Sequence, residues 1–298
     1  MATAGIGQRW VADHLPPRPA RSHKGTFGSV LVVAGSREYA GAALLAGLGA
    51  ARAGAGVVTL ATSESVADAL LGRIPELTML HLDEEAPGLL APGGWRRLAN
   101  EAGRHDALVV GPGLGRQPAT LRRVRGFLSA LRSPVVVDAD GLNALAEQDG
   151  WWRAVPQGTV LTPHPGEFAR LSRGGDPVPE DDEGRIAAAR EAAVRWKRVV
   201  VLKGANTVVA DPEGTVRRTD IATPSLATAG SGDVLAGVTG AFLAAGLDPF
   251  TAACCAVAAH GAAGLLAEDR IGRAGAMARD LAGLLPETME QLRGDVGR

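Results

Sequence analysis

Six short apolar runs recur along the chain, and each is followed by a glycine-rich turn or a helical pattern. The runs are rich in β-branched residues and almost wholly apolar rather than alternating, which is typical of strands covered on both faces. They predict strands at residues 29–34, 57–61, 107–110, 135–137, 159–161 and 199–202.

The segments between the runs favour helices. The larger apolar residues of 233–245 follow a helical period, and the alanine-rich stretch after them is expected to pack closely between neighbours. Helices are predicted at residues 41–53, 118–131, 183–197, 233–245 and 249–267. This alternation predicts an α/β fold with a mostly parallel central sheet and helices on both faces.

The breaks in this pattern are short. Residues 83–94 and 173–182 are Pro/Gly/Asp/Glu-rich loops, too short to be domain linkers, and no solenoid-type repeat is present. We therefore expect one domain over residues 1–298, with residues 1–20 as an N-terminal extension.

The charges nearly cancel, since 31 basic and 32 acidic residues give a formal net charge of -1. Neither nucleic acid nor an anionic membrane is expected as a partner, and any anion must be bound locally. Lysine is scarce, with only Lys24, Lys197 and Lys203 present. Lys203, which precedes a glycine, is therefore a candidate ligand for such an anion.

Cys254 and Cys255 are adjacent in an alanine-rich apolar run, where a disulfide would be strained and metal-ligand spacing is absent. Both are expected to be reduced and buried. No stretch is expected to reach the ~18 uncharged apolar residues of a membrane helix, and no signal-peptide pattern opens the chain. The sequence thus predicts a cytoplasmic protein.

Several common site chemistries lack their motifs. The chain has no Gly-x-x-x-x-Gly-Lys-Ser/Thr loop and no Gly-x-Ser-x-Gly elbow. Its histidines show no zinc-binding spacing. The glycines from Gly47 onward miss the dinucleotide fingerprint because Arg52 stands in place of the third glycine. Hydride transfer by a Rossmann domain is therefore disfavoured.

The strongest local motif is Gly230-Ser231-Gly232-Asp233, which opens the predicted helix 233–245. Glycines at a helix start let backbone N–H groups approach an anion, and the helix dipole favours negative charge there. Asp233 could accept a proton from a substrate hydroxyl while these amides hold a transferring phosphoryl group. An aspartate that merely stabilises the helix start is about equally compatible with this motif alone.

Two further turns follow predicted strands. Lys203-Gly204-Ala205-Asn206-Thr207 leads from strand 199–202 into a second strand and could set an ammonium and backbone amides against phosphate oxygens. A hairpin with an exposed lysine is the simpler alternative. Gly111-Pro112-Gly113-Leu114-Gly115 ends strand 107–110, where ligands of open α/β sheets bind.

Carboxylates gather at two more strand ends. Asp138 and Asp140 follow strand 135–137, and His164 and Glu167 follow strand 159–161. Such carboxylates suit Mg²⁺, which prefers few carboxylates plus phosphate and water oxygens. Singly, each residue is better explained as part of an ordinary turn. Together, the five polar or glycine-rich turns are expected to converge on one crevice.

In order and spacing, six segments resemble the ADP/ATP-dependent NAD(P)H-hydrate dehydratases of the ribokinase-like fold, over about residues 20 to 290. The His-Pro-Gly-Glu and Gly-Pro-Gly-Leu segments are the more diagnostic, whereas Gly-Ser-Gly-Asp is shared across ribokinase-like enzymes. Only about 20 residues precede the match, so we expect the stand-alone form. The segments are Lys24-Gly25-Thr26-Phe27-Gly28, Gly41-Ala42-Ala43, Gly111-Pro112-Gly113-Leu114, Thr162-Pro163-His164-Pro165-Gly166-Glu167, Lys203-Gly204-Ala205-Asn206-Thr207 and Gly230-Ser231-Gly232-Asp233.

The resemblance implies a substrate, the S epimer of NADH or NADPH hydrated at C6 of the nicotinamide ring. A phosphoryl group from ADP or ATP would pass to the ring hydroxyl, with Asp233 as base and Mg²⁺ neutralising charge, and loss of phosphate would restore the reduced cofactor. The implied hydrate contacts are Ala42, Gly113, His164 and Asp233. The implied nucleotide contacts are Lys203, Gly204, Ala205, Asn206, Thr207 and Gly232. Strand-end chemistry, rather than the resemblance, suggests Asp138, Asp140 and Glu167 as metal ligands.

Two other functions stay open at this point. A ribokinase-like small-molecule kinase, such as a thiamin-precursor kinase, needs the same anion hole and Asp233 but is not expected to carry His164-Pro165-Gly166-Glu167 in this form. A nucleotide-binding regulator would tolerate loss of Asp233. Family likeness also suggests a homo-oligomer, a tetramer among the options, and a separate NAD(P)H-hydrate epimerase as a partner.

Overall fold

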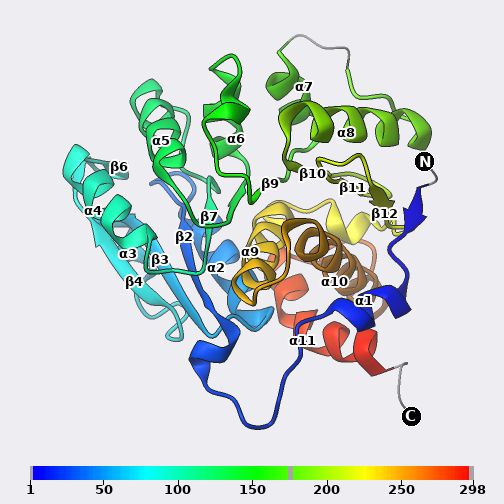
Figure 1. Cartoon of the computed structure of the whole chain (residues 1–298). Helices are drawn as coiled ribbons and strands as arrows, with labels where there is room; N and C mark the ends of the chain where they lie inside the picture. Colours follow the sequence, from blue (N-terminus) through cyan, green and yellow to red (C-terminus); the bar gives the residue numbers. More distant parts are fainter. Residues whose placement is uncertain (1–2, 174–176, 295–298) are drawn as a thin grey trace.

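The computed structural model describes residues 3–173 and 177–294 as an α/β structure around a ten-stranded sheet (Figure 1). The strand order is β1-β12-β11-β10-β9-β8-β7-β2-β3-β4, and every neighbouring pair from β10 to β4 is parallel. The strands are β1 (Ala4–Gly5), β2 (Ser29–Val33), β3 (Val57–Ser63), β4 (Thr78–Leu82), β7 (Ala107–Val110), β8 (Val135–Val137), β9 (Thr159–Leu161), β10 (Val199–Leu202), β11 (Val208–Ala210) and β12 (Val216–Arg218), with β5 (Glu84–Ala86) and β6 (Leu89–Leu90) as a separate pair.

Helices cover both faces of the sheet. On one face lie α1 (Gln8–His14), α2 (Ala40–Arg52), α3 (Glu64–Leu70), α9 (Ser231–Ala244), α10 (Pro249–Arg270) and α11 (Ala278–Gly294). On the other lie α4 (Pro92–Ala102), α5 (Pro118–Ala130), α6 (Asp140–Ala146), α7 (Pro165–Ser172) and α8 (Asp182–Trp196). Three single-turn 3-10 segments, η1 (Lys24–Phe27), η2 (Trp151–Arg153) and η3 (Pro224–Leu226), complete the elements.

Side chains of the central strands alternate between two hydrophobic cores. In β2, Val30 and Val32 pack with the core under α2 and α9, whereas Leu31 and Val33 pack with the core under α4 and α5. All four are fully buried. Because both faces are covered, successive strand residues must all be apolar, which explains the uninterrupted apolar runs.

The small residues of α2 and α9 allow the two helices to touch backbone to backbone. A Cβ at Gly237 would lie 2.0 Å from the carbonyl oxygen of Ala46, and one at Gly49 would lie 2.5 Å from that of Val234. No side chain fits at either position. This close contact fixes α9, and therefore the glycine-rich turn at its N-terminus, against the sheet.

The predicted strands and helices are confirmed, with end shifts of at most three residues. Residues 83–94, expected to be a loop, instead contain β5, β6 and the start of α4. The expected N-terminal extension is built into the fold, because β1 pairs with β12 and Val11 of α1 is fully buried. Residues 174–176 of the loop expected at 173–182 lie outside the described residues.

The expectation that no stretch is long and apolar enough for a membrane helix is wrong for α10. The helix Pro249–Arg270 is long and apolar enough, by length and composition, to cross a membrane. However, 78% of its 18-residue apolar window is buried inside the fold, where Cys254 and Cys255 are free and buried as expected. The helix therefore has the burial of a core element, with small residues that let it pack between neighbours.

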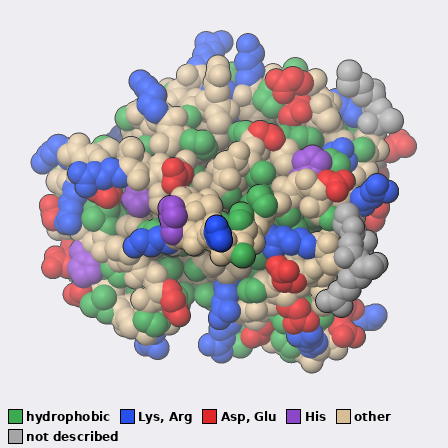
Figure 2. Space-filling model, turned by 60° about the horizontal axis from the view of Figure 1, so that its bottom comes forward, with side chains coloured by type: hydrophobic (Ala, Val, Ile, Leu, Met, Phe, Trp, Pro, Cys, Tyr) green, Lys and Arg blue, Asp and Glu red, His purple; other side chains and the backbone are tan. Residues whose placement is uncertain are grey.

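Charged side chains of both signs are interspersed on the face shown in Figure 2, with no continuous area of one sign. This distribution matches the near-zero formal net charge of -1. Anion binding on this chain must therefore depend on particular side chains and backbone amides rather than on a broad surface potential.

Candidate active site

Polar groups from the carboxyl ends of three adjacent strands meet around Lys203. The lysine directly follows β10, and its Nζ lies 2.8 Å from Oδ1 of Asp138, which follows β8. It also lies 3.7 Å from Oε2 of Glu167, which stands on α7 after β9. Turns 36 and 65 residues apart in the sequence are thus joined by ion pairs, as expected at the carboxyl edge of a parallel sheet.

Burial makes this ion-paired network rigid. Only 1% of the Asp138 side chain and 19% of the Lys203 side chain is exposed. Thr162 donates a further hydrogen bond of 2.7 Å to Asp138 Oδ1. Burial lowers the pKa of the Lys203 ammonium, but the charges of Asp138 and Glu167 outweigh this effect and raise the pKa above its usual value. Lys203 is therefore a fixed cation.

Asp233 lies in the first turn of α9, directly after Gly232. Burial, together with the negative charge of Asp138, raises its pKa to about 7, although the positive charge of Lys203 opposes the shift. A Cβ placed on Gly232 would lie 3.3 Å from Lys203 Nζ, so the start of α9 and the lysine adjoin. A carboxylate with such a pKa is suited to act as a general base near neutral pH.

His164 is the N-cap of α7. Its Nδ1 accepts from the backbone N–H of Gly166 at 3.0 Å, while Glu167 Oε2 accepts from the backbone N–H of His164 at 2.9 Å. Since Nδ1 is an acceptor, the proton of the neutral ring must sit on Nε2. Half of the side chain, 51%, is exposed, so the ring nitrogen Nε2 can reach a ligand as well as Glu167.

Ala42 and Gly113 lie together where the strand order reverses between β2 and β7. Gly113 has φ +62, and a Cβ there would lie 2.8 Å from the Cβ of Ala42. The same turn packs on the end of β8, since a Cβ at Gly111 would lie 1.9 Å from the carbonyl oxygen of Asp138. Such a reversal is where open α/β sheets bind ligands.

The carboxylates proposed as metal ligands all have protein partners. Asp138 is paired with Lys203, and Glu167 accepts from the His164 backbone. Asp140 accepts from the backbone N–H of Gly115 at 2.9 Å and from the side chain of Asn143 at 3.1 Å. Within residues 3–173 and 177–294, no three His, Cys, Asp or Glu side chains form a metal-binding group. These residues therefore do not fit a preformed Mg²⁺ cage.

The backbone between the two aspartates is strained. Ala139 has φ 49 and ψ -117, a conformation that residues with a Cβ rarely adopt. This turn separates the two carboxylates, so that Asp138 faces Lys203 while Asp140 binds the Gly115 turn. Both carboxylates raise the pKa of Asp233 through their charge.

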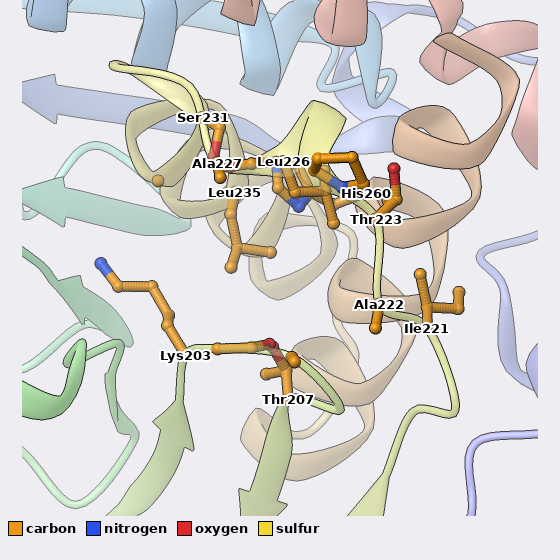
Figure 3. Close-up of a pocket in the computed structure, with 14 residues that line it drawn as sticks. Lys203, Thr207, Ile221, Ala222, Thr223, Leu226, Ala227, Ser231, Leu235 and His260 are labelled. Atoms are coloured by element: carbon orange, nitrogen blue, oxygen red, sulfur yellow. Dashed lines mark hydrogen bonds between the residues drawn. The ribbon is translucent and has the colours of Figure 1, made fainter. Parts of the chain in front are cut away.

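A cavity of about 480 Å³ opens beside Lys203, between the turn that follows β10 and the N-terminus of α9 (Figure 3). Residues of the predicted nucleotide site line it: Lys203, Gly204, Ala205, Thr207 and Gly232. The rest of its lining is mainly apolar: Ile221, Ala222, Thr223, Pro224, Leu226, Ala227, Ser231, Leu235 and His260. The polar and apolar parts suit the phosphates and the base of a nucleotide, respectively.

Asn206 differs from its neighbours because it does not line the cavity. It has φ 53, and its side-chain amide donates to Asp182 at 3.2 Å on α8. Its place in the site is thus to hold the shape of the turn, in which Thr207 Oγ1 also donates to the carbonyl of Gly204 at 2.8 Å.

The sequence motifs did not reveal three residues that support or line the site. Arg185 of α8 donates to the carbonyls of Leu202 and Lys203, at 3.2 Å each, and so holds the lysine turn. Thr162 was visible in the sequence as a polar residue at a strand end, but its bond to Asp138 depends on the pairing of β8 with β9. His260 was detectable as an ionisable residue in the middle of an apolar helix.

A cavity of about 480 Å³ lined by Lys203 and Gly232 thus lies next to Asp233, a carboxylate of raised pKa at the glycine-rich start of α9, as phosphoryl transfer to a hydroxyl requires. Solved structures share this fold, among them a ribokinase-like superfamily protein from Enterococcus faecalis with a TM-score of 0.79 at 22% identity. The chain belongs to the NAD(P)H-hydrate dehydratase family, whose model matches residues 30–287. The predicted fold class and family are thereby confirmed.

Individual relatives cover the chain almost completely. It is 40% identical over 287 residues to the bifunctional NAD(P)H-hydrate repair enzyme Nnr of Moorella thermoacetica, covering 96% of this chain but only 54% of that protein. It is 36% identical to the ADP-dependent (S)-NAD(P)H-hydrate dehydratase of Bacillus subtilis, covering 95% and 98%. The chain thus spans about half the length of the bifunctional relatives.

A solved structure agrees with these sequence matches. The ADP/ATP-dependent NAD(P)H-hydrate dehydratase of Bacillus subtilis, co-crystallised with ATP/Mg²⁺, matches with a TM-score of 0.83 and 34% identity. The match covers 98% of this chain and 99% of that one. Family membership therefore favours a dehydratase over the small-molecule kinase that the sequence left open.

Proposed function

We propose that the chain catalyses the nucleotide-dependent dehydration of the S epimer of hydrated NADH or NADPH, which returns the reduced cofactor. The position of Asp233 carries this proposal. Its carboxylate has a pKa of about 7 and follows Gly232, which lines the nucleotide-sized cavity beside Lys203. A base and a phosphate site are thus adjacent, as phosphoryl transfer to a hydroxyl requires.

The residue roles follow from this placement. Lys203 to Thr207 and Gly232 bind the nucleotide, with the ammonium and the α9 amides facing its phosphates and Asn206 shaping the turn. Ala42, Gly113, His164 and Asp233 bind the hydrate. Support comes from the contact of Gly113 with Ala42 and from the half-exposed His164 ring beside Glu167.

Asp233 takes the proton of the C6 hydroxyl while that oxygen forms a bond to the terminal phosphorus of the nucleotide. The bond from this phosphorus to its bridging oxygen breaks, and AMP leaves from ADP, or ADP from ATP. The ring nitrogen lone pair then expels phosphate from C6. The leaving phosphate takes up the proton lost from C5 and departs as hydrogen phosphate, which restores the double bond between C5 and C6. Asp233 then releases the proton of the C6 hydroxyl to solvent.

ADP or ATP is the proposed co-substrate, and Mg²⁺ the proposed cofactor. Because Asp138, Asp140 and Glu167 are occupied by protein donors, we derive no step through a metal ion held by them. Mg²⁺ bound mainly by nucleotide phosphates and water would neutralise charge on the phosphates. Lys203 supplies a fixed positive charge independently of any metal.

The remaining proposals concern the setting of the enzyme. We propose a cytoplasmic homo-oligomer, with a tetramer as one option, that acts on small molecules rather than on nucleic acid or membranes. A separate NAD(P)H-hydrate epimerase is the proposed functional partner, and the bifunctional naming of several relatives supports it.

The decisive assay mixes the protein with the S epimer of hydrated NADH, Mg²⁺ and either ADP or ATP. Return of reduced-nicotinamide absorbance, with one AMP or ADP released per NADH, is the expected result. Accumulation of a stable phosphorylated product would instead support a kinase. Nucleotide binding without turnover of the hydrate, tested with the hydrates of both NADH and NADPH, would support a regulator.

A further inference from the structure

His260 is a buried histidine in the wall of the nucleotide cavity whose role neither the family resemblance nor the mechanism explains. It lies in the middle of α10 and is only 6% exposed. Its Nε2 has no hydrogen-bond partner within the described residues. A buried polar atom without a partner costs free energy, which a ligand in the cavity would offset by bonding to it.

The surroundings of the ring are apolar. Burial lowers the pKa of His260 to about 4, with the charge of Lys203 adding to the effect and the backbone of Ser231 opposing it. The ring is therefore uncharged near neutral pH. Its hydrogen bond with the backbone of Ser231 places the single proton on Nδ1, so the unpartnered Nε2 is a hydrogen-bond acceptor. An uncharged acceptor suits an N–H of a base or an O–H of a ribose, whereas Lys203 faces the phosphates.

The packing of α10 places His260 at the apolar part of the cavity. A Cβ at Gly261 would lie 2.8 Å from Ile221 Cδ1, and one at Gly264 would lie 2.6 Å from Leu226 Cδ2. Both apolar side chains therefore lie directly against the helix next to the histidine. Figure 3 shows the ring beside Leu226, across the cavity from Lys203 and Thr207.

We infer that His260 binds the nucleoside half of the nucleotide co-substrate through a hydrogen bond that Nε2 of its uncharged ring accepts. The inference rests on the proposed function, because it assumes that the cavity holds ADP or ATP. It divides the cavity into a phosphate end at Lys203 and Gly232 and a nucleoside end at His260, Ile221 and Leu226.

Calorimetric titration with ADP, AMP and adenosine tests this division without the hydrate. His260→Leu is expected to weaken binding of all three by a similar factor of about ten, because each keeps the nucleoside and loses the same hydrogen bond. His260→Gln, whose amide can reach the position of Nε2, should recover most of the affinity. Turnover at saturating nucleotide should change by less than about twofold.

His105→Leu is the matched control, since His105 is also buried, at 9% exposure, and both of its ring nitrogens lack hydrogen-bond partners within the described part of the chain, although Nε2 lies 3.8 Å from Oε1 of Glu101. It lies outside the cavity lining, so nucleotide affinity should be unchanged. Unaltered affinity in His260→Leu, or a loss that grows with the number of phosphates, would overturn the inference. Should the leucine variant fail to fold, the shorter amide of His260→Asn serves in its place.

Failure of the inference about His260 can be distinguished from failure of the proposed function. Wild-type turnover of the hydrate tests the reaction, whereas the titrations test only the nucleotide contact. If the wild type turns over the hydrate and His260→Leu still binds ADP normally, only the role of His260 is refuted. If the wild type binds none of the three ligands, the nucleotide-dependent reaction itself is refuted.

Discussion

The two sides of the cavity differ in how their polar groups are satisfied. On the ionic side, the nearly buried Asp138 and Glu167 share Lys203, and every one of these groups has a protein partner. On the apolar side, Ile221, Leu226 and their neighbours surround one histidine whose Nε2 has none in the described residues. The ionic side is complete without a ligand, whereas the apolar side is not.

The ionic side is suited to catalysis, and the apolar side is suited to ligand binding. Charges held by each other in a buried network cannot move far, so they can fix a phosphate and set the pKa of Asp233. An apolar wall holds a ligand by contact area and discriminates by few hydrogen bonds. Substitutions on the ionic side should therefore alter chemistry and stability, and those on the apolar side only affinity.

The largest effect is expected from Asp233→Asn, which removes the base. Turnover of the hydrate should fall by about 10²- to 10⁴-fold, while calorimetric affinity for ADP stays within about threefold. The fold should tolerate the neutral amide, because burial already disfavours the charge of Asp233. Asp13→Asn on α1 is the exposed control. Retained turnover would remove Asp233 from the role of base.

Lys203→Met should have the next largest effect, because it leaves Asp138 and Glu167 buried without their cation. We expect the free energy of unfolding to fall by about 3 kcal/mol, measured by denaturant titration, with weaker ADP binding. The exposed Lys197→Met should change stability by less than about 0.5 kcal/mol. Equal stability of the two variants would contradict the buried ion-paired network.

The pH profile of kcat should rise with pH and level off above about 7, because the base must lose its proton. The folded pKa of Asp233 lies above its ordinary value of 3.8, so its contribution to stability is present at low pH and is lost as pH rises toward about 7. Asp138→Asn removes a charge that raises this pKa and should shift the kcat midpoint to lower pH. An unmoved midpoint would assign it to another group.

The smallest effect is expected from shortening the apolar wall. Leu226→Ala should weaken ADP binding by about three- to tenfold, since it removes part of the contact area, and should leave kcat at saturating nucleotide unchanged. Leu265→Ala, on the exposed side of α10 at 46% exposure, is the matched control. A large fall in kcat for Leu226→Ala would show that the two sides of the cavity are not separate in function.

The local pattern of apolar and polar residues was sufficient to predict the central strands and to locate the glycine-rich turns. Apolar runs predicted β2, β3 and the four strands β7 to β10, because strands covered on both faces are apolar along their whole length. Among the elements it missed, β4 and β5 are more exposed and mixed in character, and β6 is only two residues long. Glycine-rich turns at strand ends pointed to residues such as Gly113 and Gly232 because their backbone requirements are local.

The sequence by itself determined an α/β fold, a lysine turn and an aspartate at the start of a helix, since each depends on neighbouring residues. Only the tertiary structure decided that Asp138 is bound to Lys203 rather than free to hold a metal, and that Asn206 turns away from the cavity toward Asp182. It also decided that Nε2 of His260, in the cavity wall, has no partner in the described structure. Strand order and helix packing determine which side chains from distant parts of the sequence come into contact. Short-range periodicity does not encode these contacts.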